Sequence, residues 1–343
     1  KDFRIGAEGK LWGFNWGLNH GFRVFNDGSN YLLAGPNPGN NTTDTTVYNA
    51  YSKYYPVVGN GSFSQFNVNR TFADKFDVTG RIMYSTTKSR SNIVETFTGG
   101  RDNQNNFIDL DQFTINGKSK RPQMRADLGF TFRATDDFRI SNTISYDRFT
   151  VNGGENLQEY FNFRNAANTI TTYRSIASYA YRVNDFNRLS NLLEADYQFS
   201  NKFSIHAGWR HTRREINVFG LEGSTTTNTI LPTPSPQPTP SVSSLTIGET
   251  EENSTNTFIA GTKIKPTKGW VIFADVEHGT SDNVFTRLEN YDFTNFRVRS
   301  RWSYKTFTVN VSGITKNNTN PSQTVDNPGL PFGTDVKSRT FSG

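Results

Sequence analysis

Charged residues at every second position carry the most direct chemical meaning in this sequence. Single residues separate Arg297, Arg299 and Arg301, and a single residue separates Asp275 from Glu277. In a β-strand, side chains two positions apart point to the same side, so each set would form a charged row. Guanidinium groups attract anions or pair with carboxylates on neighbouring strands. Anion selection and internal ion pairing are both open at this point.

The same alternation recurs elsewhere and gives a set of residues that we expect to face one side. They are Arg125, Arg133, Arg139, Arg188, Arg210, Asp275, Glu277, Arg297, Arg299 and Arg301. On the wall of a water-filled pore, such groups set ion selectivity and solvate the wall. We therefore predict that these ten residues line a lumen.

Catalytic and metal-binding arrangements have little support. Asp196, Ser204 and His206 would face the same side and are the residue types of a hydrolytic triad, but a long sheet supplies such trios by chance. The four His residues form no pair at metal-ligand spacing, and Cys is absent. No glycine-rich phosphate loop stands between a strand and a helix. We expect no enzyme activity, no cofactor and no metal site.

Composition indicates which elements position these charges. Hydrophobic residues make up 34% and aromatic residues 14% of the 343 residues, whereas soluble domains are roughly 45–50% apolar. A transmembrane β-barrel needs an apolar residue only at every second strand position. No apolar run of about 18 residues occurs, which excludes a transmembrane helix. The net charge of +6 is weak for a nucleic-acid binder, so we expect no nucleic-acid partner.

Alternating hydrophobicity predicts hairpins of two strands of about ten residues joined by a very short turn. In residues 124–146, apolar side chains take one parity and polar side chains the other, around a turn at Thr135-Asp136-Asp137. The predicted hairpins are 3–25, 66–84, 124–146, 189–209, 258–276 and 296–311. They give about twelve strands, and a further strand would start near Asp335.

Long polar segments separate the hairpins, and we expect them to be loops. They are 26–62, 89–121, 150–185, 213–254, a shorter one after Gly279, and 315–334. Within them, residues 232–241 are rich in Pro and should be extended and solvated. Regular alternation of short and long connections is typical of outer-membrane barrels, which have short periplasmic turns and long extracellular loops.

Aromatic residues flank the short turns on the apolar parity. They are Phe72, Phe76, Phe132, Phe138, Phe199, Phe203, Trp270, Tyr304 and Phe307. Aromatic girdles form where a barrel meets the lipid headgroups, and these nine residues are the predicted girdle. Core residues at one end of a β-sandwich are the competing interpretation. Four polar residues on the same parity conflict with contact to lipid, namely His20, Arg70, Asn142 and Asn191, unless Arg70 lies near an interface or the register shifts.

With these residues, the chain resembles porin-like outer-membrane β-barrels of Gram-negative bacteria. The resemblance rests on three strand–turn–strand segments, Phe72-Ala73-Asp74-Lys75-Phe76, Ala134-Thr135-Asp136-Asp137-Phe138 and Phe199-Ser200-Asn201-Lys202-Phe203. It implies an all-β, antiparallel up-and-down transmembrane barrel of about 12 or more strands in the outer membrane, with lipid around it. The barrel would be a single domain over residues 1–343 that works as a channel.

A second resemblance, to the large barrels that sheath multihaem cytochromes, implies a plug or cytochrome partner in the lumen. The sequence ends at Phe341-Ser342-Gly343 inside an expected strand, which predicts a longer protein with more strands. The alternative class is an extracellular adhesive or structural β-protein whose Asn/Thr-rich loops bind surfaces or sugars. Solubility without detergent would distinguish it.

Overall fold

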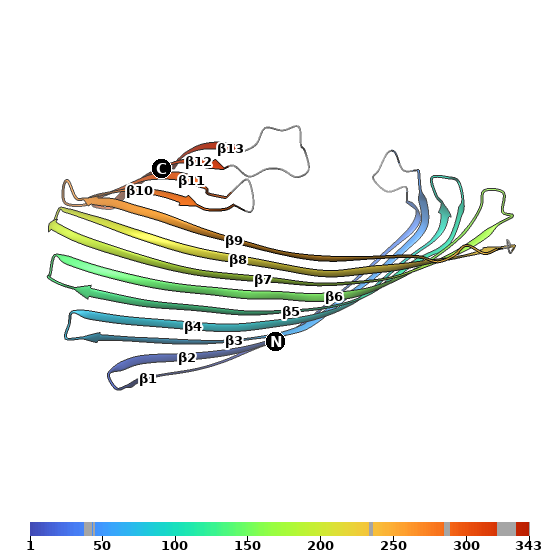
Figure 1. The fold of residues 1–343 in the computed structure, drawn as a ribbon, viewed down its shortest axis with the longest axis horizontal. Coiled ribbons are helices and arrows are strands. Elements are labelled where there is room, and N and C mark those ends of the chain that lie inside the picture. The colour runs from blue at the N-terminus through green and yellow to red at the C-terminus, as the bar shows by residue number, and fades with distance from the viewer. Residues whose placement is uncertain (38–42, 44, 233–235, 285–288, 321–333, 343) are drawn as a thin grey trace.

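The computed structural model describes residues 1–37, 43, 45–232, 236–284, 289–320 and 334–342, and every regular element in them is a β-strand (Figure 1). Thirteen strands of this part of the chain form one antiparallel sheet and pair in chain order. They are β1 (Asp2–Leu11), β2 (Phe14–Asn37), β3 (Val47–Phe72), β4 (Phe76–Arg101), β5 (Phe107–Arg133), β6 (Phe138–Arg164), β7 (Thr171–Ser200), β8 (Phe203–Leu231), β9 (Ser241–Ile264), β10 (Trp270–Ser281), β11 (Asp292–Tyr304), β12 (Phe307–Asn320) and β13 (Thr334–Ser342). The predicted all-β, up-and-down architecture is confirmed, and β13 is the strand expected near Asp335.

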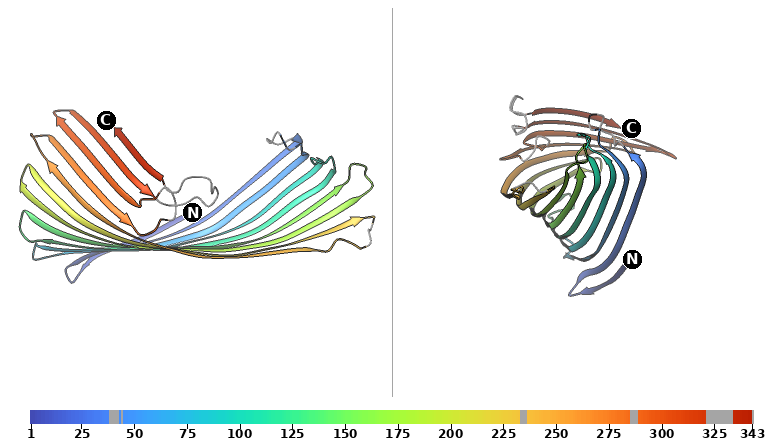
Figure 2. Two further views of the ribbon diagram at one scale, coloured as in Figure 1. Left: turned by 45° about the horizontal axis from the view of Figure 1, so that its top comes forward. Right: turned by 90° about the vertical axis from the view of Figure 1, so that its right-hand side faces the viewer.

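The sheet is strongly curved and, over the described residues, open. Its pairing order begins at β1 and ends at β13. Figure 2 shows the strands in the middle of the sheet running along its whole length, whereas β10 to β13 occupy one end. Curvature of this kind follows from the right-handed twist of each strand, which accumulates across a large sheet.

The segments predicted to be long loops are mostly strand, so that prediction was wrong in its extent. Residues 89–121, for example, form the far ends of β4 and β5, which are joined by residues 102–106. β7 has 30 residues and at about 3.3 Å per residue is on the order of 100 Å long. A membrane-spanning strand needs only about 9–11 residues. The added length is rich in polar residues, which pair as strand here without alternating with apolar ones.

The Pro-rich segment 232–241 lies between β8 and β9, and its role as an extended, solvated loop stays a prediction. Residues 233–235 lie outside the described residues, residues 237–240 have no regular structure, and Ser241 begins β9. The side chain of Gln237 holds this connection to the end of β8, because its amide donates to and accepts from the backbone of Ile230 at 3.1 Å.

Short turns join the strands at the opposite end, as predicted. In the β3–β4 turn, Ala73 and Asp74 have φ of 48° and 57°, and Lys305 in the β11–β12 turn has φ of 50°. Left-handed residues of this kind are common in short hairpin loops, of three residues between β3 and β4 and of two residues between β11 and β12. The sheet therefore has tight turns at one end. From there its longest strands extend well beyond the thickness of a membrane.

A dry interior between two layers is missing from the described part of the chain. Its only buried hydrophobic side chains are Ile108 and Phe293. Because a β-sandwich buries the inner faces of two sheets against each other, the single sheet contradicts the sandwich interpretation of the aromatic residues. The described residues also contain no helix long and apolar enough to cross a membrane.

Candidate functional site on the polar face

Strand register sorts the side chains into two faces. Residues paired directly across neighbouring strands share a face. Phe72 pairs with Phe76, which pairs with Phe132, whereas Arg81 pairs with Asp127 on the other side. We call the face that carries Phe76 the apolar face and the face that carries Arg81 the polar face.

The apolar face carries exposed aromatic side chains beside the short turns. Phe307 is 71% exposed, Phe199 57% and Phe132 45%. Aromatic rings of successive strands pack against each other. The ring centroids of Phe72 and Phe76 are 6.3 Å apart, and those of Phe199 and Phe203 are 5.2 Å apart. All nine residues of the predicted girdle lie on this face, and three neighbours that the sequence analysis missed join them, namely Phe14, Tyr197 and Trp302.

The polar residues that conflicted with lipid contact, and two further histidines, have partners on the apolar face. Arg70 lies near a short turn, where it donates to the carbonyl of Trp12 at 2.5 Å and stacks on Phe72 at 4.2 Å. Asn142 donates to Asn191 Oδ1 at 2.6 Å. Three histidines are hydrogen-bonded to cross-strand neighbours at 2.9 to 3.0 Å, His20 to Ser64, His211 to Asn256 and His278 to Thr294. The residues that seemed to contradict a lipid-facing surface are therefore hydrogen-bonded within it or placed at its edge.

Ion pairs connect neighbouring strands on the polar face. Arg81 Nε donates to Asp127 at 3.0 Å, and Ser145 donates to the same carboxylate at 2.8 Å. Six arginines predicted to face a lumen lie in ion pairs on this face. Four of these pairs connect neighbouring strands: Arg133 with Asp77, Arg139 with Asp196 (3.1 Å), Arg188 with Asp147 (3.9 Å) and Arg299 with Asp275 (3.6 Å). Arg125 pairs with Asp127 on its own strand (4.0 Å), and Arg210 on β8 pairs with Glu277 on β10, across β9. Half-exposed pairs contribute only about 0–1 kcal/mol each, so their main effect is to make the wall polar.

The carboxylate of Asp275 on β10 contacts His206 on β8, two strands away. His206 Nε2 lies 3.5 Å from Asp275 Oδ1, although β8 and β10 are separated by β9. The residue between them is Gly261, which pairs with both. A Cβ atom at Gly261 would lie 2.3 Å from His206 Cε1 and 2.5 Å from Asp275 Oδ1. Glycine is therefore required for this contact.

The trio considered for hydrolysis is not assembled. His206 turns to Asp275, and the carboxylate of Asp196 accepts from Arg139 at 3.1 Å. Ser204 is paired with Lys263 on β9. A triad needs the acid to orient the His and the His to contact the Ser. Asp196 and His206 are register partners, but their side chains contact Arg139 and Asp275 instead.

Two arginines of β11 have no carboxylate partner among the described residues. Arg297 and Arg301 are exposed, while Arg299 between them pairs with Asp275. A hollow of about 470 Å³ beside Arg301 is lined by Arg299, Arg301 and Asn310, together with serines, Phe273 and Val311. Because amides and guanidinium groups donate hydrogen bonds, this part of the polar face presents donors and positive charge to a solute.

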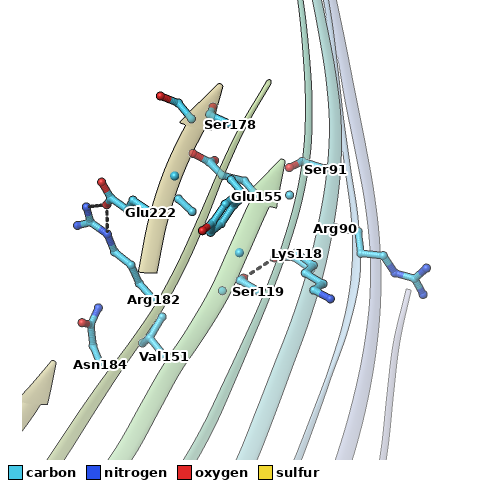
Figure 3. A pocket seen from close by; sticks show the side chains of 18 of the residues that line it. Arg90, Ser91, Lys118, Ser119, Val151, Glu155, Ser178, Arg182, Asn184 and Glu222 are labelled. Atoms are coloured by element: carbon cyan, nitrogen blue, oxygen red, sulfur yellow. Dashed lines mark hydrogen bonds and ion pairs between the residues drawn. The ribbon is translucent and has the colours of Figure 1, made fainter. Parts of the chain in front are cut away.

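A larger hollow of about 810 Å³ lies on the polar face farther from the short turns. Figure 3 shows Glu155, Arg182 and Glu222 at its side, and Arg182 Nε donates to Glu222 at 3.0 Å. Serines from several strands, including Ser178, complete the lining. The described residues contain no group of three His, Cys, Asp or Glu side chains placed to hold a metal ion. This hollow is polar and open along the sheet.

Comparison with known proteins gives loose structural likenesses. No protein-family model and no curated protein sequence matches the chain. The toluene transporter TodX of Pseudomonas putida is 9% identical over 93% of this chain and 77% of its own, with a TM-score of 0.39. The monoaromatic hydrocarbon channel CymD is 11% identical over 92% and 82%, also at 0.39. The toluene transporter TbuX of Ralstonia pickettii is 10% identical over 92% and 75%, at 0.35. At these values we infer nothing from them about solutes.

Proposed function

We propose that this protein forms the wall of a transmembrane β-barrel channel in the outer membrane of a Gram-negative bacterium. The observation that carries the proposal is the sorting of faces in the part of the sheet next to the short turns: exposed apolar side chains on one side from β1 to β12, and ion pairs and free charges on the other. An exposed apolar surface of this extent marks a membrane or protein contact. In a bilayer, a sheet satisfies its backbone hydrogen bonds only when it closes into a barrel.

The length of the apolar surface fits a bilayer. On β6 it covers residues 138–146, about 9 residues, which matches a tilted membrane-spanning strand. Beyond it, the same face becomes polar, with Arg148 and Asp185 in contact at 3.2 Å. The apolar face would contact hydrocarbon, and the polar face would surround water.

Passive diffusion is the mechanism that this arrangement supports. The wall excludes lipid, and its charges select among solutes by their electrostatic field. Because most arginines are neutralised by a neighbouring carboxylate, the unpaired Arg297 and Arg301 determine the sign of the field near β11. We therefore propose a preference for small anions over cations. A plug or cytochrome in the lumen stays a separate prediction, as does the absence of enzyme activity, and co-purification of a haem Soret band would test the former.

The test is reconstitution of the full chain. Protein refolded in detergent should insert into planar bilayers and give stepwise conductance, with a reversal potential in a KCl gradient that indicates anion preference. Folded protein that leaves the bilayer silent would contradict the channel. Protein that folds and stays in aqueous solution without detergent would contradict the barrel and favour the adhesive class.

A further inference from the structure

On the apolar face, we call the exposed apolar side chains next to the short turns the apolar stretch. Four cations form a cluster on this face of β4 and β5, farther from the short turns than the apolar stretch. Lys88 pairs directly with Lys120, and Arg90 pairs directly with Lys118. All four side chains are exposed. Like charges directly opposite each other destabilise a sheet, so an anion bound between two such successive pairs would relieve their repulsion. We call these four residues the cationic cluster.

No carboxylate of the described chain compensates the cationic cluster. The flanking register partners are Asn60 and Val58 on β3 and Asn152 and Gly154 on β6, and none is acidic. In Figure 3, Arg90 extends away from Glu155 and Glu222, which lie on the polar face.

Other cations on this side of the sheet show that pairing is available. Arg148 contacts Asp185 at 3.2 Å, and Arg213 pairs with Glu252. The absence of a partner at the cationic cluster is therefore local to this part of the described sheet.

The cationic cluster lines a groove. All four of its side chains, with Asn152, border a groove of about 350 Å³, which adjoins a second of about 720 Å³ that shares Arg90 and Lys118. The ring of Tyr181 lies over Gly154, since a Cβ there would be 3.3 Å from Tyr181 Cδ2. Because Gly154 has no side chain, it leaves room for the ring of Tyr181, which forms one side of the groove. The four cations line the rest of it together with polar residues.

The position of the groove relative to the apolar stretch identifies its surroundings. On β4, Lys88 is four residues beyond Tyr84, the last aromatic side chain of the apolar stretch on that strand. On β5, Lys120 is four residues from Met124, where the apolar stretch begins. If the apolar stretch spans hydrocarbon, the groove lies at the level of the headgroups at the end away from the short turns.

We propose that this groove binds the phosphate groups of an anionic membrane lipid. The inference rests on the proposed function, because it needs the apolar face to lie in a bilayer. Lys and Arg are the residues that bind phosphate, Lys as a point charge and Arg with a bidentate fork. Basic clusters beside a membrane attract anionic lipids. The lipid phosphate would supply the negative charge that the chain itself does not place here.

The experiment compares lipid retention by two charge-matched variants. The groove variant carries Lys88→Gln, Arg90→Gln, Lys118→Gln and Lys120→Gln. The control removes four cations at the short turns, with Lys75→Gln, Lys202→Gln, Lys268→Gln and Lys305→Gln. Wild type and both variants are refolded into phosphatidylcholine vesicles containing phosphatidylglycerol, extracted in mild detergent and purified, and retained phosphatidylglycerol is measured by mass spectrometry.

Wild type and the control should retain phosphatidylglycerol, and the groove variant should lose it at least several-fold. Equal retention by all three proteins would overturn the proposal. Displacement of the lipid from wild type by inorganic phosphate, but not by the same ionic strength of chloride, would overturn the lipid assignment in favour of a soluble anion. Conductance measurements on wild type and the groove variant distinguish the failure of the two proposals. If both form channels and retain phosphatidylglycerol equally, only the lipid-binding groove is refuted. If wild type never inserts into the bilayer, the barrel itself is refuted.

Discussion

The amide of Asn142 donates to Asn191 Oδ1 at 2.6 Å across β6 and β7, about halfway along the apolar stretch. Two polar side chains on a face of exposed apolar residues satisfy each other. In hydrocarbon, such a pair is tolerated only while both members are present, because no water can replace a missing partner.

Asn142→Ala should therefore destabilise the protein in lipid by about 1–3 kcal/mol, since it leaves the Asn191 amide unpaired. The double variant Asn142→Leu/Asn191→Leu should recover most of that loss. Urea unfolding in vesicles would measure both. A double variant that recovers none of the lost stability would show that the two side chains are not coupled and that this region faces water.

Adjacent residues of β6 offer a test of the two faces. Ile144→Arg would place a guanidinium in hydrocarbon and should cost about 2–4 kcal/mol or prevent insertion. Thr143→Arg, one residue away on the polar face, should insert and unfold like wild type. Equal tolerance of both changes in vesicle-refolding assays would mean that the faces do not meet different solvents.

Ion selectivity should depend on the unpaired arginines of β11. The double variant Arg297→Gln/Arg301→Gln should lower the chloride-to-potassium permeability ratio several-fold, because it removes positive charge that no carboxylate neutralises. Reversal potentials in a KCl gradient provide the measurement. Lys268→Gln/Lys305→Gln removes the same charge from the short turns of neighbouring strands and should change the ratio much less. An unchanged ratio in the β11 variant would refute the selectivity role.

Acid should stabilise the far end of β5, which lies beyond the apolar stretch. Burial raises the pKa of Asp111 to about 6, and the nearby charge of Glu159 adds to the rise while Arg174 opposes it. The carboxyl of an unfolded chain has a pKa of about 3.9. As pH rises from about 4 to about 6, the unfolded chain has already released this proton while the folded chain retains it, so the stability of the folded state falls through this window.

Asp111→Asn should remove that fall and raise stability at neutral pH. Amide hydrogen exchange of the far ends of β5 and β6, measured on both sides of the window, would report it locally. An equally steep loss of protection in the variant would assign the pH dependence to another group.

Much of the fold was predictable because its signal is local. Alternation along each strand predicted which residues share a face. The register places the nine aromatic residues on the apolar face and the alternating arginines on the polar face, whereas their roles as girdle and lumen wall stay predictions. This works because a strand between hydrocarbon and water needs opposite polarity at odd and even positions. The same reasoning failed for the far strand ends, where both faces carry polar residues. Arg90, Lys118 and Lys120 therefore fell within the predicted loop 89–121, although the spacing of Lys88 and Arg90, and of Lys118 and Lys120, by two residues was visible.

By itself, the sequence determined the faces, the short turns and the strand class, since these depend on neighbours two residues apart. Only the tertiary structure decided the partners. Asp275 pairs with Arg299 rather than Arg297, its direct register neighbour, and it meets His206 across Gly261. Such contacts depend on register, on diagonal reach between strands and on a glycine in a third strand. These relationships join residues far apart in the chain, and no local periodicity encodes them.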